Sequence, residues 1–195
     1  NNILIGNAGD DQLGGGGGAD TFQGGVGNDS YTVDSTNDVV LDLAGEGTDT
    51  VNTTVSWTLG ANTENVNVNS SDSIQINGNS GANLLTFTRR PAGDDYYGSV
   101  GVRAAGGAGD DRYVYAQSYA SLGTDALPIT LALTELAGGG NDTLQLNLPY
   151  VRLPNEIENL TVTSVPISSV EYLIAYGPGE RERPKYFGNA GNNTL

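Results

Sequence analysis

The stretch GNAGDDQLG (6–14), GGGGADTFQ (15–23) and GGVGNDSYT (24–32) decides the fold of this chain. These three consecutive nonapeptides share Gly at the fourth place, Asp at the sixth and a large apolar residue at the eighth. Self-similarity at a fixed period is the signature of a solenoid, in which each repeat packs against its neighbours. The sequence therefore predicts a stack of short coils.

Looser copies of the pattern follow along the chain. They are VDSTNDVVL (33–41), AGEGTDTVN (44–52), GNSGANLLT (78–86), GGAGDDRYV (106–114), AGGGNDTLQ (137–145) and GNAGNNTL (188–195). The segments between them, such as TVNTTVSWTL (50–59), alternate apolar and polar residues and are rich in Val and Thr, as strands are. We therefore expect an all-β protein, in which the apolar residues at the eighth place point inward: Leu4, Leu13, Phe22, Tyr31, Val40 and Val51.

A longer period overlies the nonapeptides. GGVGNDSY (24–31) matches GGAGDDRY (106–113), and GEGTDTV (45–51) matches GGGNDTL (138–144). We predict a first block at 1–86, with regular nonapeptides in 1–52, a strand-rich part in 53–77 and GNSGANLL at 78–85. A second, degenerate block would follow at 87–187, with insertions near 87–105, 116–128 and 163–187, and 188–195 would start a further repeat.

The nonapeptides resemble the repeats-in-toxin (RTX) pattern G-G-x-G-x-D-x-U-x, a calcium-binding repeat. The resemblance is close over 1–32 and looser beyond. It implies a right-handed parallel β-roll or β-helix in which two nonapeptides form one coil and calcium ions lie in the turns, between stacked coils. Residues 18 apart would then lie next to each other in adjacent coils: Asn2 with Asp20, Asp11 with Asp29, and Asp20 with Asp38. Asp29 and Asp49 are 20 apart and would pair if the coil between them contains a two-residue bulge.

The residue types suit calcium, which takes 6–8 oxygen ligands from carboxylates and backbone carbonyls. An isolated Asp in such a turn is more often an ordinary turn residue, but three in strict register favour an ion site. By the resemblance, carbonyls at the early places and carboxylates at the sixth place bind several Ca²⁺ ions. The expected metal ligands are Gly6, Ala8, Asp11, Gly15, Gly17, Asp20, Gly25, Gly27, Asp29, Asp38, Asp49, Asp111 and Asp142.

Composition limits the other functions. The chain has no Cys and no His, which removes thiolate chemistry, Ser-His-Asp catalysis and the commonest transition-metal ligand. Its net charge of −15 makes nucleic acid an unlikely partner, and no apolar run is long enough for a membrane span. We therefore expect no enzymatic activity.

The expected function is a calcium-stabilised structural or spacer module of a secreted bacterial adhesin, cell-surface or filament-forming protein. The RTX resemblance implies type I secretion. The alternative is a carbohydrate- or partner-binding module, or the calcium-dependent C-terminal secretion and folding domain of a secreted hydrolase or epimerase. Neither end of the repeat array carries a cap, which predicts head-to-tail contact with copies of itself or adjacent modules. Arg- and Tyr-rich segments at 89–103 and 171–187 are either loop decoration or a surface for a glycan or a subunit.

Overall fold

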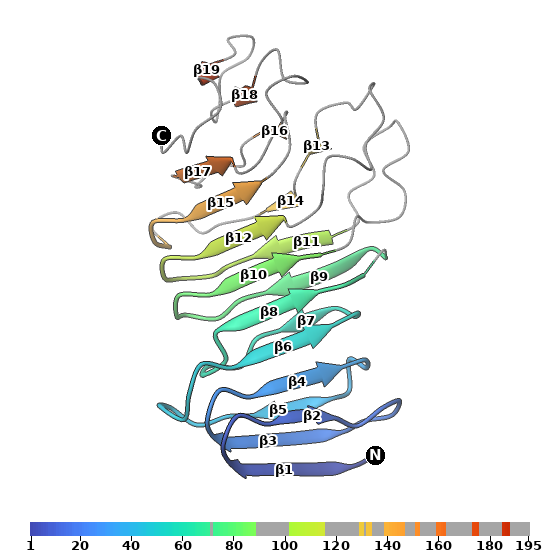
Figure 1. Ribbon diagram of the computed structural model, residues 1–195. Coiled ribbons are helices and arrows are strands. Elements are labelled where there is room, and N and C mark those ends of the chain that lie inside the picture. The colour runs from blue at the N-terminus through green and yellow to red at the C-terminus, as the bar shows by residue number, and fades with distance from the viewer. Residues whose placement is uncertain are drawn as a thin grey trace.

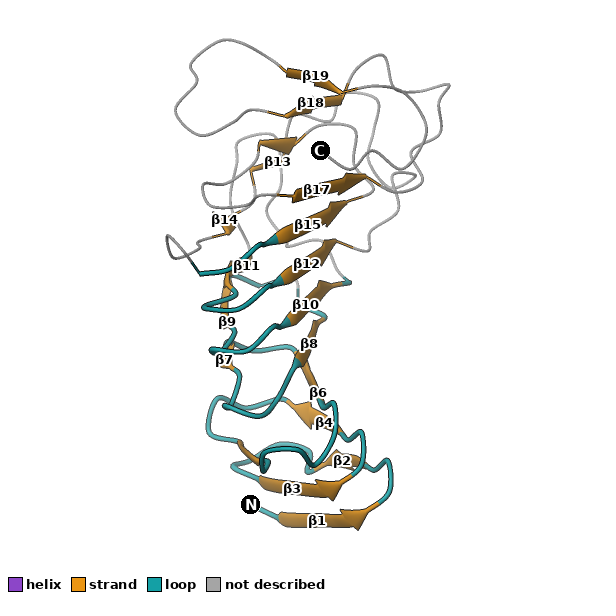
Figure 2. Ribbon diagram, turned by 90° about the vertical axis from the view of Figure 1, so that its left-hand side faces the viewer, coloured by secondary structure: helices purple, strands orange, loops and turns teal. Residues whose placement is uncertain are grey.

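The computed structural model describes residues 1–70, 72–88, 102–115, 129–130, 132–133, 139–146, 151–152, 159–162, 173–175 and 185–187. Every regular element within these ranges is a β-strand. Figures 1 and 2 show short strands stacked one above another from the N-terminus upward, joined by turns that carry the chain from one face of the stack to the other. The all-β parallel solenoid that the repeats predict is confirmed.

One long sheet runs along the stack. Its eight strands are all parallel and follow chain order: β2 (Gln12–Gly14), β4 (Ser30–Val33), β6 (Thr50–Thr53), β8 (Asn65–Val68), β10 (Leu84–Phe87), β12 (Arg112–Tyr115), β15 (Thr143–Leu146) and β17 (Asn159–Val162). Each strand pairs with the equivalent strand of the next coil, as in Leu13 opposite Tyr31 and Tyr31 opposite Val51.

The opposite side is made of two shorter parallel sheets. The first contains β1 (Ile3–Ala8), β3 (Thr21–Val26) and β5 (Val39–Leu41). The second contains β7 (Trp57–Thr58), β9 (Ile74–Asn77), β11 (Val102–Ala105) and β14 (Ala132–Leu133). Two further pairs are β13 (Ile129–Thr130) with β16 (Val151–Arg152), which is parallel, and β18 (Leu173–Ala175) with β19 (Lys185–Phe187), which is antiparallel and departs from the solenoid pattern.

Coil length varies while the stacking register holds. Equivalent residues of successive coils are 18 residues apart at Asp11 and Asp29, but 28 apart at Asn83 and Asp111 and 31 apart at Asp111 and Asp142. The strands that flank the two long coils still pair directly, β10 with β12 and β12 with β15. The extra residues therefore leave the ladder of the long sheet intact. The predicted block boundary after residue 86 falls inside β10.

The interior is a thin column of apolar side chains. Phe22, Tyr31 and Val51 are at most 1% exposed, and Leu4, Leu13 and Val40 pack against them. The inward direction predicted for the eighth place is therefore confirmed. Alternate residues point outward, and on the long sheet they form polar ladders: the Asn67 side-chain amide donates to Asn52 Oδ1 at 3.0 Å, and Asn52 donates to Ser30 Oγ at 2.8 Å.

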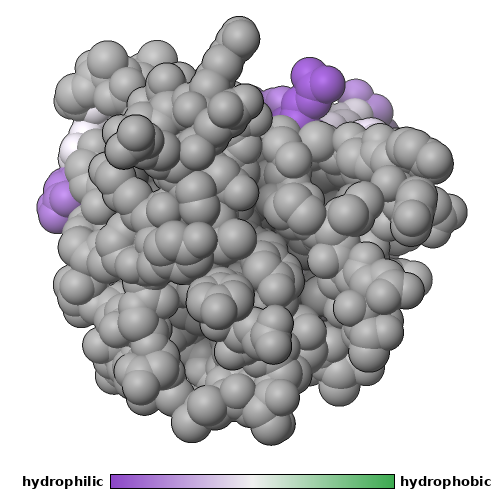
Figure 3. Space-filling model, turned by 90° about the horizontal axis from the view of Figure 1, so that it is seen from above, coloured by the Kyte–Doolittle hydropathy of each residue, from purple (hydrophilic) through white to green (hydrophobic). Residues whose placement is uncertain are grey.

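The outer surface has both hydrophilic and apolar regions. In the view from above, the described residues that show at the rim are mostly hydrophilic (Figure 3). The outward face of the sheet formed by β1, β3 and β5 is an exception, because Ile3, Ile5, Val39 and Leu41 are between 44% and 78% exposed there. Among the described residues no helix is long and apolar enough to cross a membrane.

Candidate calcium sites

The Asp side chains at the sixth place connect each coil to the one before it. Each lies directly before a strand of the long sheet or of the β1–β3–β5 sheet, where the turn becomes extended chain. Asp29 Oδ1 accepts the backbone N–H of Asp11 at 2.8 Å, and Asp49 Oδ1 accepts that of Asp29 at 2.7 Å. The same bond joins Asp20 to Asn2 at 2.6 Å, Asp38 to Asp20 at 2.9 Å and Asp142 to Asp111 at 2.9 Å. We call this series the place-six ladder.

The ladder brings together every pair that the sequence predicts to stack. Asn2 with Asp20, Asp11 with Asp29, and Asp20 with Asp38 are joined at 18 residues, and Asp29 with Asp49 at 20. Asp111 and Asp142 lie in adjacent coils although 31 residues separate them. The structure thus places the predicted carboxylates in columns along the solenoid. That they bind calcium stays a prediction from this geometry.

In Asp20, Asp29 and Asp49 one carboxylate oxygen accepts a ladder bond, and the other is left without a donor. The Oδ2 atoms of Asp11, Asp20, Asp29 and Asp49 are buried and have no hydrogen-bond partner. Asp20, Asp29 and Asp49 are each 1% exposed. A buried carboxylate needs a positive partner or several donors, because its desolvation penalty is several kcal/mol. A divalent cation next to Oδ2 satisfies this need, so the residues present fit calcium.

Glycine at the first place of a nonapeptide leaves room beside that oxygen. A Cβ on Gly6 would overlap Oδ2 of Asp11, one on Gly15 would overlap Oδ2 of Asp20, and one on Gly24 would overlap Oδ2 of Asp29. No other residue type therefore fits the first place in these turns. Gly25, at the second place, has φ of +97°, which only glycine adopts readily.

The carboxylates of one column repel each other. Burial raises the pKa of Asp29, the N–H of Asp11 opposes this, and the charges of Asp49, Asp11 and Asp10 raise the pKa further. A raised pKa means that the environment disfavours the charged form. A bound cation would reverse the balance, because it neutralises the column where the carboxylates cannot neutralise each other.

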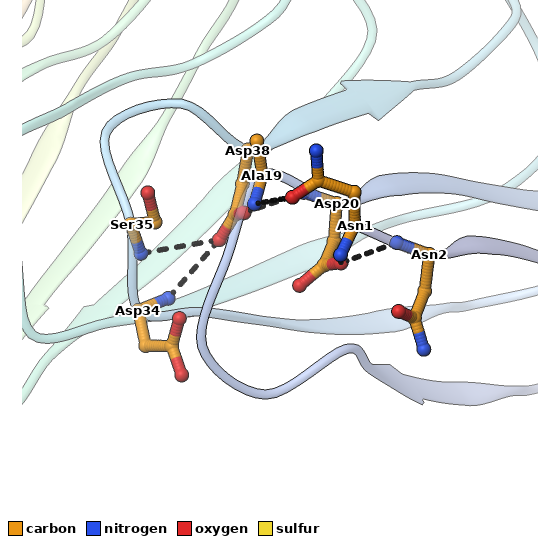
Figure 4. Close-up of polar contacts among 7 residues, drawn as sticks. All are labelled: Asn1, Asn2, Ala19, Asp20, Asp34, Ser35 and Asp38. Carbon is orange, nitrogen blue, oxygen red and sulfur yellow. Dashed lines mark hydrogen bonds and ion pairs between the residues drawn. The ribbon is translucent and has the colours of Figure 1, made fainter.

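Asp38 differs from the other predicted ligands. Its Oδ2 accepts the N–H of Ser35 at 3.1 Å and that of Asp34 at 3.3 Å, while its Oδ1 accepts the N–H of Asp20. Figure 4 shows its carboxylate turned toward these backbone groups. Its turn, Val33 to Asn37, contains no glycine. Asp38 therefore fits the role of a turn-stabilising residue better than that of a calcium ligand.

The predicted carbonyl ligands lie in adjacent turns. Gly6 and Ala8 belong to β1, which pairs with the part of β3 that contains Gly25, and Gly27 follows directly. Gly15 and Gly17 lie in the turn that precedes Asp20. In the part of the chain that the structure describes, no group of three or more acidic side chains is close enough to hold a metal. An ion between coils would therefore depend on backbone carbonyls as well as on carboxylates.

Comparison with known proteins agrees with this geometry. Residues 1–40 match the family model of the RTX calcium-binding nonapeptide repeat, in four copies. This amino-terminal segment is an RTX repeat array. It contains Asp11, Asp20 and Asp29, which are the carboxylates with both an unpartnered Oδ2 and a glycine beside it. No curated protein and no solved structure gave a significant match.

Sequence reasoning missed a second ladder at the fifth place. Asp10 Oδ1 accepts the N–H of Asn28 at 2.8 Å, and Asn28 Oδ1 accepts that of Thr48 at 2.9 Å. These bonds run from each coil to the next, opposite in direction to the place-six ladder. Repeated Asn or Asp before the sixth-place residue, as in Asp10-Asp11 and Asn28-Asp29, was the available signal.

Two members of the place-six ladder were also missed. Glu64 Oε2 accepts the N–H of Asp49 at 2.8 Å, so a longer side chain continues the ladder into a coil of 15 residues. Asn83 occupies the sixth place of its turn, donates its N–H to Asp111 Oδ1 at 2.8 Å, and accepts the N–H of Asn79 at 2.8 Å. Asn83 thus joins the ladder through its backbone N–H, while its side-chain oxygen bonds within its own turn.

Proposed function

We propose that this chain is a calcium-stabilised structural module, a spacer within a secreted bacterial surface, adhesin or filament-forming protein. The observation that carries the proposal is a set of sixth-place carboxylates, each with a buried oxygen that has no donor: Asp11, Asp20, Asp29 and Asp49. Calcium between the coils would neutralise these charges and connect adjacent turns. Because the apolar column is thin, ion binding would contribute directly to the free energy of folding.

The acidic and amide side chains of the turns and of the long sheet hold adjacent coils together, which supports a structural role. The place-five and place-six side chains bond to the backbone of neighbouring coils, and the outward amides of Asn52 and Asn67 bond along the sheet. Without His or Cys, the chain lacks the usual general base and thiol nucleophile. We therefore propose that the module has no catalytic activity.

Secretion is proposed on the same grounds. RTX calcium-binding repeats, which residues 1–40 match, are typical of secreted proteins. Extracellular calcium modules have dissociation constants of about 10⁻⁴–10⁻³ M, whereas cytosolic sensors bind at about 10⁻⁷–10⁻⁵ M. A folding midpoint in the weaker range would leave the chain unfolded inside the cell and fold it outside.

Circular dichroism and small-angle X-ray scattering of the purified chain test the proposal. With calcium we expect strand content and an elongated, compact particle; with a chelator we expect loss of both. Magnesium at equal concentration is the specificity control, because it demands six ligands in near-ideal octahedral geometry and retains its water. Equal strand content without calcium, or an equal response to magnesium, would contradict the proposal.

Contact with a neighbouring copy or module is the proposed means of assembly. The exposed apolar face of the β1–β3–β5 sheet, with Ile3, Ile5, Val39 and Leu41, supports it. Sedimentation of the calcium-loaded chain and of an Ile5→Lys, Leu41→Lys variant would test this contact. A wild type that stays monomeric at high concentration would exclude self-association of the isolated chain.

A glycan-binding role has one supporting observation. Hydroxyl and amide side chains line a groove at the ends of successive strands of the long sheet: Thr32, Asn52, Thr54, Asn67 and Thr88. Such groups can exchange hydrogen bonds with sugar hydroxyls. The Arg- and Tyr-rich segments predicted as a contact surface lie mostly outside the described residues. Screening the chain against a glycan array, with Asn67→Ala as the comparison, tests the alternative.

A further inference from the structure

Asp42 occupies a position that glycine occupies in the two preceding coils. The register of β1 with β3 places Gly6 opposite Gly24, since Ile5 pairs with Gln23 and Asn7 with Gly25. The register of β3 with β5 pairs Gln23 with Leu41, so the next residue, Asp42, continues the column of Gly6 and Gly24. In the preceding coils this position is a glycine that lies beside the Oδ2 of Asp11 or Asp29. In this coil it carries the carboxylate of Asp42.

The neighbours of Asp42 are other oxygen atoms. Its carboxyl group lies within hydrogen-bonding reach of the Asp49 carboxyl group. The Oδ2 atoms of both residues are buried, and neither has a donor. Asp49 is 1% exposed and already uses Oδ1 to accept the N–H of Asp29. Two carboxyl groups, each with a buried oxygen that has no donor, therefore lie close together.

Tyr31 adds a third oxygen-bearing group near this pair. Its side chain is fully buried, and its hydroxyl lies close enough to Asp42, Asp49 and Asp29 to feel their charge, Asp42 most strongly. A Cβ added to Gly24 would overlap both this hydroxyl and Asp29 Oδ2, so the two oxygens lie next to each other. The Tyr31 hydroxyl thus lies beside Asp29 Oδ2 and within range of the charges of Asp42 and Asp49.

The loop that delivers Asp42 is fixed by its own hydrogen bonds. Leu43 N–H bonds to Asp42 Oδ1 at 2.9 Å and to Glu46 Oε2 at 3.2 Å, and the Asn62 side chain donates to the Asp42 carbonyl at 2.9 Å. Oδ1 of Asp42 is therefore held by its loop, and its buried Oδ2 has no donor. This coil is two residues longer than the standard 18, as the Asp29–Asp49 separation of 20 shows.

We propose that Asp42 and Asp49 together bind a divalent cation, Ca²⁺, at a site with two carboxylates from one turn and the Tyr31 hydroxyl facing it. The site differs in composition from the glycine-lined sites of the nonapeptide pattern, because its second carboxylate stands where the preceding coils have Gly6 and Gly24. Extra ligand charge tightens calcium sites. The ion at this level therefore binds before the ions of the first two coils.

This site deepens the proposed function and rests on it, because it lies in the same calcium-binding solenoid. Two variants test it: Asp42→Asn, which removes the charge and keeps the shape, and Asp42→Gly, which restores the residue found at Gly6 and Gly24. Asp72→Asn, a surface position with the same charge change, is the matched control. The measurements are calorimetric calcium stoichiometry and Tb³⁺ emission excited through tyrosine, with circular dichroism in calcium to verify the fold.

Both Asp42 variants should bind one ion fewer than Asp72→Asn and lose the tightest Tb³⁺ step, and Tyr31→Phe should lower the sensitised emission of that step. Unchanged stoichiometry and first-step affinity in a folded Asp42→Asn would overturn the site and show that the two carboxyl groups share a proton instead. A wild type that binds no calcium at all would be a different result, since it would remove the proposed function together with this site.

Discussion

Replacing Asp29 by Asn should have opposite effects with and without calcium. Asp29 has one carboxylate a coil below it, Asp11, and one a coil above it, Asp49. Stacked coils are separated by about 4.8 Å. Two unit charges at that distance repel by roughly 3–4 kcal/mol at an effective dielectric of about 20, and by about 1 kcal/mol in water.

The substitution removes two of these repulsions and keeps the ladder. Asparagine retains an Oδ1 for the N–H of Asp11, and Asn83 occupies a sixth place without loss of stacking. The calcium-free solenoid should therefore become more stable by about 2–7 kcal/mol, the range between the two dielectric limits. With calcium the same change should weaken binding, because an amide replaces a charged ligand.

The assay must detect a stabilised form even if the calcium-free chain is unfolded. Trimethylamine N-oxide favours compact states because it is excluded from the protein surface. In chelator, Asp29→Asn should reach native strand content at a lower concentration of this osmolyte than wild type does. In a calcium titration without osmolyte, its folding midpoint should move to higher calcium, and its calorimetric stoichiometry should fall by one ion.

Asp72→Asn, exposed and outside the ladder, controls for net charge and should leave both midpoints near the wild type. If Asp29→Asn is destabilised in chelator as well as in calcium, the carboxylate contributes through its hydrogen bonds and not through charge repulsion. If neither midpoint moves, Asp29 is not a ligand and the assigned register of the ion sites is wrong.

Gly24→Ala should lower thermal stability by roughly 1–3 kcal/mol and weaken calcium binding, because its Cβ would overlap Asp29 Oδ2 and the Tyr31 hydroxyl; Gly17→Ala, whose Cβ meets nothing within 4 Å, should melt like wild type. Asn52→Ala should cost about 1 kcal/mol of unfolding free energy both with and without calcium, since it breaks an outward amide bond unrelated to the ions; a calcium-dependent loss would contradict this. The pH dependence follows from Asp42, whose pKa is raised to about 7 by burial and by the neighbouring Asp49. Because the folded state then holds a proton that the unfolded state releases near its ordinary pKa of about 3.9, strand content of the calcium-free chain should rise as pH falls from about 7 toward about 4. Calcium affinity should fall over the same range as protons compete for the carboxylates, and a calcium-free chain that loses structure on mild acidification would refute the assignment.

The columns of carboxylates could be predicted because the spacing of the nonapeptides sets the stacking. Asp11, Asp20 and Asp29 recur at nine residues, and two nonapeptides per coil give the observed partners 18 residues apart. Asp111 and Asp142 were both predicted as ligands, but their stacking across 31 residues was not among the predicted pairs. Local sequence patterns thus predicted both the fold and the positions where coils meet.

Features that depend on contacts between coils were not visible in the sequence. Glu64 continues the ladder because its longer side chain reaches Asp49 across a coil of 15 residues, which breaks the nonapeptide spacing. Asp38 matches the pattern at its sixth place, but the glycine-free turn before it supplies two N–H groups to its Oδ2. Asp42 falls between two nonapeptides, and only the pairing of β3 with β5 reveals that it stands in line with Gly24.

The two ladders explain why the ion sites can be separated from the fold itself. Where the fifth place of the first array holds Asn or Asp, its side chain bonds forward to the next coil, while a sixth-place side chain bonds backward, as Asp10 does to Asn28 and Asp29 does to Asp11. These bonds use one oxygen of each side chain and need no metal. The unpartnered Oδ2 atoms carry the remaining charge, so calcium acts on repulsion between coils and not on the hydrogen bonds that set their register. An amide at the sixth place should consequently preserve the architecture and remove its dependence on the ion, since Asn83 already occupies a sixth place in the turn before the longer coils.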